Sequence, residues 1–177
     1  VVAVLREQSQ SGQDALRDLA ERDALTGVAN YRTLYERLAY EIARHERHNR
    51  RFVLTLLDLD RFKQVNEEHG HLEGDRVLRE VGRVLSFSVR EPDTLARQGG
   101  DEFSVLAPEA DASDAERLAG RLSGALASIR IDGRPLTASI GWAVFPEDGT
   151  SPDALVARAD NALLESKRDR RSRQYAV

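Results

Sequence analysis

The chain has 177 residues, which is one domain of ordinary size with a little left over, and 41% of them are hydrophobic against 32% charged, so a disordered chain is excluded. Acidic residues outnumber basic ones 30 to 26, and the net charge of −4 argues against a general nucleic-acid binder, which needs a basic surface. The chain contains no cysteine, which excludes a disulfide framework, a thiolate metal site and a thiol nucleophile.

Residues 1–22 differ in pattern from the remainder. Leu5, Gly12, Ala15 and Leu19 recur at heptad-like spacing with charged residues between them. This spacing predicts a linker helix that pairs with its copy from a second chain in a coiled coil. Because the repeat is short and contains poor helix formers, an unpaired terminal helix is the alternative. The sequence therefore divides into a linker helix over 1–22 and a globular domain over 23–177.

Helical and strand patterns alternate through the globular domain. Gly27 ends the first pattern, and Asn30 can cap a helix whose apolar side contains Leu34, Leu38 and Ile42. The next predicted elements are a strand buried on both faces over 52–57, a helix over 77–85, a hairpin over 94–107 and a helix over 115–126. The last are a strand over 137–145, a turn over 146–149, a helix over 155–163 and a short closing strand over 174–177. This order predicts an α/β (α+β) fold of two layers, a sheet with helices on one face.

Asp58 and Asp60 form a first acidic pair at the end of the buried strand. Residues two apart in a strand point to the same face, and carboxylates at a strand end suit a hard cation such as Mg²⁺. The alternative is that both side chains cap the helix that follows, because a helix N-terminus needs hydrogen-bond acceptors.

Asp101 and Glu102 form a second acidic pair, at the tip of the hairpin. Gly99 and Gly100, directly before them, let the chain turn tightly and let its backbone approach a ligand closely. If the strand that ends in Asp58 lies beside this hairpin, three carboxylates gather and raise one another's pKa. A divalent cation would remove that penalty and create a phosphate-binding centre, whereas separate, solvated acids are the alternative.

A basic segment lies near the end of the chain, where Lys167 and Arg171 are four residues apart and share a helix face. In an otherwise acidic chain this concentration suits a polyphosphate, and a solvated basic terminus is the alternative. Lys63, on the helix after the first acidic pair, could add a phosphate donor. Asn66 and Asp75 could recognise a base, because a carboxylate can accept two N–H bonds from guanine but not from adenine.

Several separate segments together resemble the GGDEF family of bacterial diguanylate cyclases. The resemblance covers about residues 20–175 and begins with the pentapeptide GGDEF at 99–103. Other matching segments are DALTGVAN at 23–30, DLDRFKQVN at 58–66, GHLEGD at 70–75, and SIG at 139–141 followed by Asp160, Ala162, Leu163 and Lys167. The departures, none of which removes a metal or guanine residue, are Val28, Tyr31, Glu67, Gln98, Arg170 and Ser172. The departure at Arg170 could alter the final turn, and with it the assignment of the neighbouring Arg171.

The resemblance implies a palm-like nucleotidyl cyclase fold, with a mostly antiparallel central sheet flanked by helices. Each subunit of a homodimer would bind one GTP with Mg²⁺ or Mn²⁺, and each 3′-hydroxyl would attack the α-phosphate on the other subunit. The products would be cyclic di-GMP and two pyrophosphates. The implied catalytic residues are Asp101, Glu102 and Lys63, and the implied metal residues are Asp58, Leu59, Asp101 and Glu102. The implied GTP-binding residues are Phe62, Lys63, Asn66, His71, Asp75, Gly99, Gly100, Lys167 and Arg171.

Arg90 and Asp93 are spaced as R-x-x-D shortly before Gly99. The resemblance implies that this motif is an inhibitory site, where cyclic di-GMP binds and stops turnover. Arg121, on the next predicted helix, stands where the family has a second product-binding arginine. The alternative is an ion pair at the end of a helix.

Two further functions stay open at the level of sequence. One is a non-catalytic module that senses cyclic di-GMP through Arg90 and Asp93, or GTP for a partner domain, and the other is a dimerisation scaffold. No apolar run approaches the ~18–20 residues that span a bilayer, so we expect a cytoplasmic location with no direct membrane contact by these residues. Because the chain begins at Val1 and has no methionine, we expect a fragment of a longer protein with an upstream sensor and room for a membrane anchor.

Overall fold

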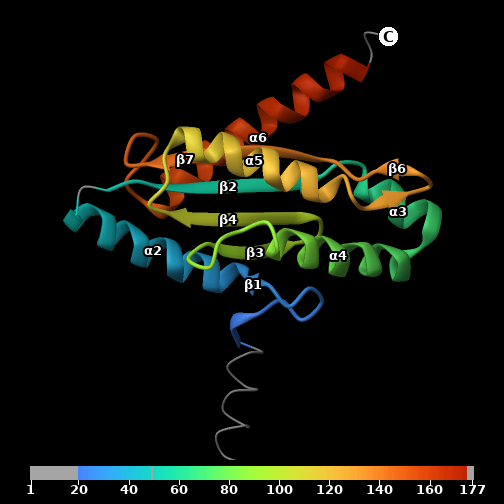
Figure 1. The fold of residues 1–177 in the computed structure, drawn as a ribbon, viewed down its shortest axis with the longest axis horizontal. Helices are drawn as coiled ribbons and strands as arrows, with labels where there is room; N and C mark the ends of the chain where they lie inside the picture. The colour runs from blue at the N-terminus through green and yellow to red at the C-terminus, as the bar shows by residue number, and fades with distance from the viewer. Residues whose placement is uncertain (1–19, 49, 175–177) are drawn as a thin grey trace, which may run out of the picture.

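A five-stranded sheet forms the centre of the molecule in the computed structural model, which describes residues 20–48 and 50–174 (Figure 1). The strands follow the order β1-β3-β4-β2-β7, and neighbours are antiparallel except for β1 and β3, which are parallel. The mostly antiparallel sheet expected from the sequence is therefore confirmed. The strands are β1 (Ala29–Asn30), β2 (Phe52–Leu59), β3 (Thr94–Gly99), β4 (Glu102–Pro108) and β7 (Ala138–Phe145).

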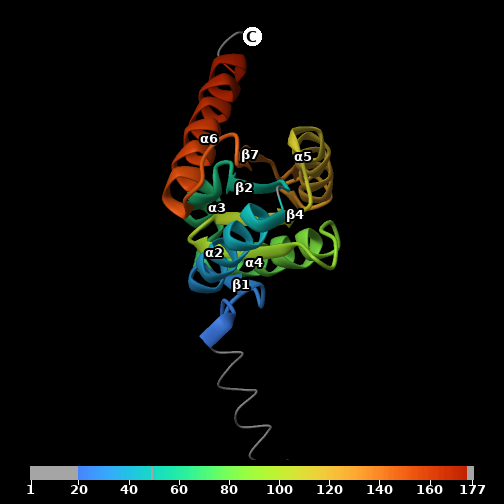
Figure 2. The same ribbon diagram turned by 90° about the vertical axis from the view of Figure 1, so that its left-hand side faces the viewer.

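Helices cover both faces of this sheet, as Figure 2 shows for α5 and α6 on opposite sides. One buried cluster contains α3 (Phe62–His69), α4 (His71–Ser86) and α5 (Ala112–Leu126), and the other contains α2 (Tyr31–His48) and α6 (Pro152–Gln174). Side chains of β2 alternate between them, with Val53 and Leu57 in the first and Leu54 and Leu56 in the second. The predicted two-layer arrangement is therefore wrong, because a strand that is apolar at nearly every position needs cover on each face.

The local signals read from the sequence are present in the structure. The Asn30 side chain accepts a hydrogen bond from the Thr33 N–H at 2.9 Å and so caps the start of α2. β3 and β4 form the predicted hairpin, and the turn over 146–149 is closed by a 2.8 Å hydrogen bond from the Asp148 N–H to the Val144 carbonyl. Periodicity and turn residues therefore located most elements correctly.

Two other expectations about the elements need correction. The closing strand predicted over 174–177 is wrong for Gln174, which is the last residue of α6, and residues 175–177 lie outside the described chain. The charged C-terminal segment continues the helix because it lacks a helix-breaking residue. A second small sheet of β5 (Arg130–Ile131) and β6 (Arg134–Pro135) was not predicted, because two-residue strands carry no periodic pattern.

The linker helix predicted over 1–22 lies almost entirely outside the described residues, and only Ala20 and Glu21 are seen to be helical. The boundary between 22 and 23 therefore stays a prediction. Within the described ranges, no helix combines the length and the apolar character needed to cross a bilayer.

α6 lies directly against β7 because Gly141 has no side chain. A Cβ at Gly141 would lie 2.1 Å from the Leu163 backbone nitrogen and 2.5 Å from the Ala159 carbonyl oxygen, distances that no real Cβ tolerates. This close approach fixes the position of the helix that carries Lys167, so the fold delivers that lysine to the edge where β2 ends.

Candidate active site

The β3–β4 hairpin holds the second acidic pair in a fixed turn. Gly99 and Gly100 have φ angles of +147° and +51°, a region that favours glycine. The Arg97 guanidinium donates to the Gly100 carbonyl from Nε at 3.1 Å and from Nη2 at 2.8 Å. Asp101 and Glu102 follow directly, so their backbone is held by two glycines and one arginine.

The first acidic pair lies beside that turn. Asp58 is opposite Glu102 in the β2–β4 ladder and opposite Ser139 in the β2–β7 ladder. The Leu59 N–H donates to the Asp101 carbonyl at 3.2 Å. Opposite residues of antiparallel strands have Cβ atoms about 5 Å apart, so the side chains of Asp58 and Glu102 are neighbours on one face. The structure therefore brings together the four residues predicted to hold metal.

These carboxylates carry more negative charge than the nearby cations neutralise. Burial, and then the charge of Asp58, raises the pKa of Asp101 above its ordinary value. Burial and Asp58 raise the pKa of Glu102 in the same way, with Asp101 as a further like charge. Lys167 opposes both shifts without cancelling them. Raised pKa values on neighbouring acids mark a place where an added cation would stabilise the charged forms.

Lys167 supplies the cation that Asp58 contacts in this structure. Its Nζ lies 2.8 Å from Asp58 Oδ2, and the two side chains are 30% and 17% exposed. In the described chain, the one group of three histidine or acidic residues whose ligand atoms all lie within 4.8 Å of one another is Glu68, His69 and Asp132. The ligand atoms of the predicted metal residues are therefore farther apart than those of Glu68, His69 and Asp132, although the residues are neighbours. Their all-oxygen donor set and surplus negative charge fit a hard divalent cation.

Asp60 faces α6, as the acid two residues before it does. Its carboxylate accepts hydrogen bonds from Thr137 Oγ1 at 2.6 Å and Ser139 Oγ at 2.8 Å, and it forms an ion pair with Arg170. The alternative that Asp60 caps the following helix is wrong, because α3 begins after Arg61 and no side chain caps its first turn. Its oxygens are already occupied, so Asp60 joins the end of β2 to β7 and α6 instead of completing a metal site.

α3 begins with the residues implied for phosphate binding. Phe62 is buried, whereas the Lys63 side chain is 89% exposed, with its Nζ 3.6 Å from Glu67 Oε1. The structure therefore places Lys63 in solvent rather than against the acids. Arg171 belongs to α6, and its side chain lies outside the described part of the chain.

The residues implied for the base lie where α3 meets α4. A Cβ at Gly74 would lie 1.9 Å from Asn66 Oδ1, so the absence of a side chain at Gly74 lets the Asn66 amide pack against α4. Asp75 is the next residue, at the start of the second turn of α4, and His71 begins that helix with an exposed side chain. The structure thus groups Asn66 and Asp75 and leaves His71 at the surface.

The three residues of the predicted inhibitory site also lie together. Asp93 has a side chain only 1% exposed, and it accepts the Arg90 N–H at 2.8 Å and Arg90 Nη2 at 3.0 Å. Arg121 Nε donates to the Ser88 carbonyl at 3.2 Å, and Arg121 lines one small hollow with Arg90 and Asp93. The ion pair that the sequence left as an alternative is present within this same group.

The chain matches the family model described as diguanylate cyclase, GGDEF domain, over residues 20–173. The chain belongs to the GGDEF family. It is 40% identical over 161 residues to the diguanylate cyclase DgcP of Pseudomonas aeruginosa, a match that covers 89% of this chain and 24% of DgcP. The chain spans about a quarter of the length of the first curated relatives it matches.

Two solved structures resemble this GGDEF domain closely. Diguanylate cyclase SiaD of Pseudomonas aeruginosa, in complex with its activator SiaC, aligns with a TM-score of 0.80 at 38% identity, over 95% of this chain and 67% of that chain. The coiled coil and GGDEF domain of DgcB from Caulobacter crescentus, in complex with c-di-GMP, aligns with a TM-score of 0.81 at 29% identity, over 95% of this chain and 91% of that chain. The palm-like fold expected from the sequence is therefore confirmed.

Two contacts in this GGDEF domain were not predicted. Arg97 Nη1 lies 3.0 Å from Asp23 Oδ1, so one arginine joins the segment 23–30 to the glycine turn. An arginine two residues before a pair of glycines was the available signal. The ion pair of Asp60 and Arg170 had no such signal, because Arg170 stood out from the sequence only as a departure from the family pattern.

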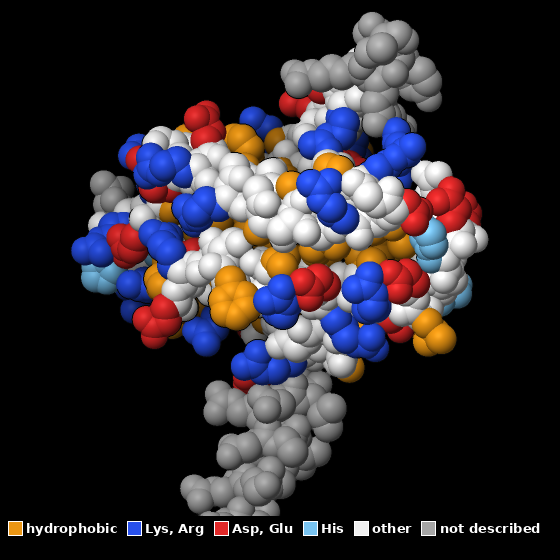
Figure 3. Space-filling model, turned by 45° about the vertical axis from the view of Figure 1, so that its right-hand side comes forward, with side chains coloured by type: hydrophobic (Ala, Val, Ile, Leu, Met, Phe, Trp, Pro, Cys, Tyr) orange, Lys and Arg blue, Asp and Glu red, His pale blue; other side chains and the backbone are white. Residues whose placement is uncertain are grey.

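The surface of the GGDEF domain carries charges of both signs. On the face shown in Figure 3, basic and acidic side chains are interspersed, without a large area of one sign. A cavity of ≈ 800 Å³ between α2 and α4 is lined by Asp93 and Pro108 but by none of the predicted metal residues. Strand register and charge therefore define the candidate active site, rather than the volume of a cavity.

Proposed function

We propose that this chain is a diguanylate cyclase that condenses two GTP molecules into cyclic di-GMP and two pyrophosphates. The observation that carries the proposal is the meeting of Asp58, Asp101 and Glu102 at adjacent strand ends, with surplus negative charge, in a GGDEF domain. Lys167 beside them supplies a cation on the side that a triphosphate would approach.

The donor set suits a divalent cation, Mg²⁺ or Mn²⁺, held by Asp58, Asp101, Glu102 and the Leu59 carbonyl. Such an ion, when bound, supplies the positive charge that binds phosphate oxygens. The carboxylate of Asp101 accepts the proton of the attacking 3′-hydroxyl. The 3′-oxygen then bonds to the α-phosphorus, and the bond from that phosphorus to the bridging oxygen breaks to release pyrophosphate.

Other residues bind and orient the nucleotide in this proposal. Lys167 and Arg171 on α6, and Lys63 with the backbone at Phe62 on α3, bind the phosphates. Lys63 reaches them by a side-chain rotation, since its exposed ammonium is held only by an ion pair, which costs little to break. The glycine turn and His71 lie along the same nucleotide. Asn66 and Asp75 bind guanine, which the packing of Asn66 against α4 supports.

A homodimer is part of the proposal, because each domain offers one set of acids and the reaction joins two nucleotides. Residues 1–22 act in it as a linker that sets how the two domains of residues 23–177 face each other. An upstream sensor in a longer protein would then control activity through that linker. The substrate places the domain in the cytoplasm, where nucleoside triphosphates are available.

The test is to incubate the dimeric, folded chain with GTP and Mg²⁺ and to separate the products by chromatography. We expect cyclic di-GMP and two equivalents of pyrophosphate, and no product from ATP. Absence of cyclic di-GMP from protein shown to be dimeric and folded, with either Mg²⁺ or Mn²⁺, would reject the proposal.

A second function, a non-catalytic module that senses cyclic di-GMP, is supported by the preformed group of Arg90, Asp93 and Arg121. A buried, ion-paired Asp93 holds Arg90 before any ligand arrives, which lowers the cost of binding. Calorimetry with cyclic di-GMP and with GTP distinguishes the two functions, because a sensor binds the first and forms no product from the second.

A further inference from the structure

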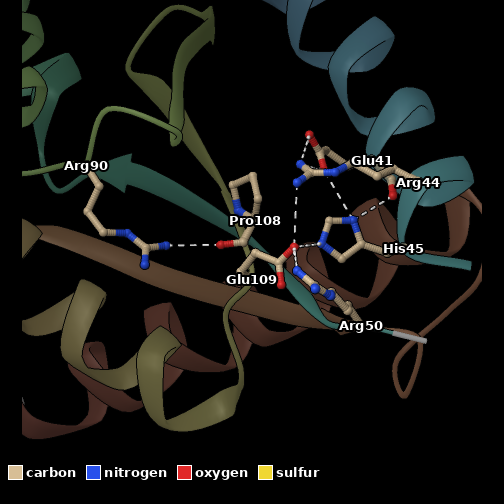
Figure 4. Close-up of polar contacts among 7 residues, drawn as sticks. All are labelled: Glu41, Arg44, His45, Arg50, Arg90, Pro108 and Glu109. Carbon is tan, nitrogen blue, oxygen red and sulfur yellow. Dashed lines mark hydrogen bonds and ion pairs between the residues drawn. The ribbon is translucent and has the colours of Figure 1, made fainter. Parts of the chain in front are cut away.

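Arg90 of the inhibitory motif is held from two sides, and Figure 4 shows the side formed by Pro108. Asp93 accepts from its backbone and guanidinium, and the Pro108 carbonyl at the end of β4 accepts from Nη2 at 3.2 Å. Within the described chain, Nη1 makes no hydrogen bond, and the Arg90 side chain is 47% exposed. The position of the Pro108 carbonyl therefore helps to set where the free side of Arg90 points.

Two arginines and a histidine surround the carboxylate of the residue after Pro108. Glu109 has a φ angle of +53°, a conformation that is rare for a residue with a side chain. Its Oε1 lies 2.9 Å from Arg50 Nη1, 3.6 Å from Arg44 Nη2 and 3.8 Å from His45 Nε2. The hydrogen bond from Arg50 contributes most to lowering the pKa of Glu109 below its ordinary value. The carboxylate stays charged and holds a strained backbone in place.

His45, on α2, is the buried and fixed member of this group of side chains. Its side chain is fully buried, and Nδ1 lies 2.9 Å from the Glu41 carbonyl oxygen and 3.1 Å from Glu41 Oε2. The ring packs edge-on against Phe52 at 5.2 Å between centroids. In the described structure Nε2 is buried without a hydrogen-bond partner, and it is directed at Glu109. The contacts with Glu41 and Phe52 fix the ring on α2, with the Glu109 carboxylate at its other end.

We propose that Glu109 is a positioning residue for the product site, because it links α2 to the Pro108 carbonyl that orients Arg90. The inference rests on the proposed binding of cyclic di-GMP at Arg90 and Asp93. Without the Glu109 charge, the strained backbone loses the contacts that hold it, and the Pro108 carbonyl is free to move. Arg90 then keeps its ion pair with Asp93 but loses its fixed second acceptor.

The experiment compares two glutamine variants, Glu109→Gln and Glu147→Gln. Both change one exposed glutamate that pairs with a neighbouring arginine, since Glu109 pairs with Arg50 and Glu147 pairs with Arg51, and the side chains are 41% and 46% exposed. Only Glu109 adjoins the carbonyl that contacts Arg90. Calorimetry measures the Kd for cyclic di-GMP, and a coupled pyrophosphate assay measures the initial rate with GTP while a phosphodiesterase removes product.

We expect Glu109→Gln to weaken cyclic di-GMP binding by about fivefold, the effect of one hydrogen bond, with an unchanged initial rate. Glu147→Gln should bind cyclic di-GMP like the wild type. A Glu109→Asp variant, which keeps the charge, should recover part of the affinity. Loss of affinity with retained rate separates positioning of Arg90 from general damage to the fold.

The inference is overturned if Glu109→Gln binds cyclic di-GMP as tightly as the wild type, or if Glu147→Gln weakens binding equally. A wild-type chain that makes cyclic di-GMP without binding it at Arg90 overturns the inference and leaves the cyclase proposal intact. A chain that binds cyclic di-GMP in a Glu109-dependent way but makes none supports the inference and rejects the cyclase.

Discussion

The two ends of β4 carry the same kinds of charged side chain in opposite electrostatic states. At the Glu102 end, burial and the charge of Asp58 raise the pKa of Asp101 and Glu102, and Lys167 is the nearby cation. At the Pro108 end, the hydrogen bond from Arg50 leads the contacts that lower the pKa of Glu109. The comparison separates acids that need an external cation from acids whose charge the chain itself neutralises.

The first end suits ligand binding, because an uncompensated charge gains most from a bound cation. The second end suits the holding of geometry, because Asp93 is buried there and accepts hydrogen bonds from both the backbone and the guanidinium of Arg90. Removing an acid should therefore cost activity at the Glu102 end and cost stability or product affinity at the Pro108 end.

The largest effect should come from Asp101→Ala. We expect the rate of cyclic di-GMP formation to fall by about a thousandfold or more, since a metal-binding carboxylate supplies several kcal/mol of charge stabilisation. The melting temperature should stay the same or rise, because the change removes a charge that its neighbours repel. Product chromatography and circular dichroism measure the two quantities.

Asp169→Ala is the matched control for that change, because Asp169 is an exposed acid on α6, two residues from Lys167. It should leave rate and stability within error of the wild type. Retained activity in Asp101→Ala would contradict the metal role, and unfolding of Asp101→Ala would contradict the assignment of surplus charge at this end.

Asp93→Asn tests the opposite end and should show the opposite result. Its side chain is buried and accepts both the backbone N–H and the guanidinium of Arg90. We expect the free energy of unfolding to fall by about 1–2 kcal/mol and product affinity to fall at least tenfold, while the initial rate is kept. Urea unfolding and calorimetry measure these changes; a lost initial rate with unchanged stability would reverse the comparison.

Most of the fold and part of the site were predictable from the sequence. A nearly continuous apolar run located β2, turn glycines and apolar periodicity located the hairpin and the helical stripes, and the GGDEF pentapeptide located Asp101 and Glu102. The sequence predicted that Asp58 meets Glu102 only if the strand that ends in Asp58 lies beside the hairpin. Strand order depends on packing that no local pattern encodes. The register of β2 against β4 places Asp58 opposite Glu102, and a shift of one residue would move Asp58 to the other face of the sheet.

The remaining contacts were not predictable, because they join distant segments through side chains that face several directions. Arg97 reaches Asp23, and Arg170 reaches Asp60, and no spacing rule connects either pair. Lys63 illustrates a different gap: its place in the motif was clear, but its exposed orientation follows from helix geometry. Local chemistry therefore predicted which residues matter better than it predicted which residues touch.

Lys167→Ala sharpens the description of the Glu102 end. We expect the KM for GTP to rise by about tenfold, with a smaller change in kcat, because the ammonium binds phosphate in the ground state as well as in the transition state. Stability should change by less than about 0.5 kcal/mol, because a partly exposed ion pair contributes little. Steady-state kinetics and urea unfolding provide the numbers; a fall in kcat alone, with KM unchanged, would place Lys167 in the chemical step instead.

The smallest expected effect tests whether Asp23, an acid paired with Arg97, also stabilises the glycine turn beside Asp101 and Glu102. Burial alone would raise the pKa of Asp23, but hydrogen bonds from Thr26 and Arg97 hold it below the ordinary value of 3.8. A carboxyl group with a lowered folded-state pKa stabilises the fold above its unfolded pKa and loses that contribution as the pH falls through the folded value. Asp23→Asn should therefore cost about 1 kcal/mol near pH 7 and almost nothing at about pH 2. Urea unfolding of both proteins at the two pH values checks this, and an equal loss at both would show that Asp23 acts through packing rather than through its charge. Arg97 also donates to the Gly100 carbonyl. A measured pH dependence would therefore show that the ion pair of Asp23 and Arg97 stabilises the glycine turn, next to the acids whose charge the chain does not neutralise.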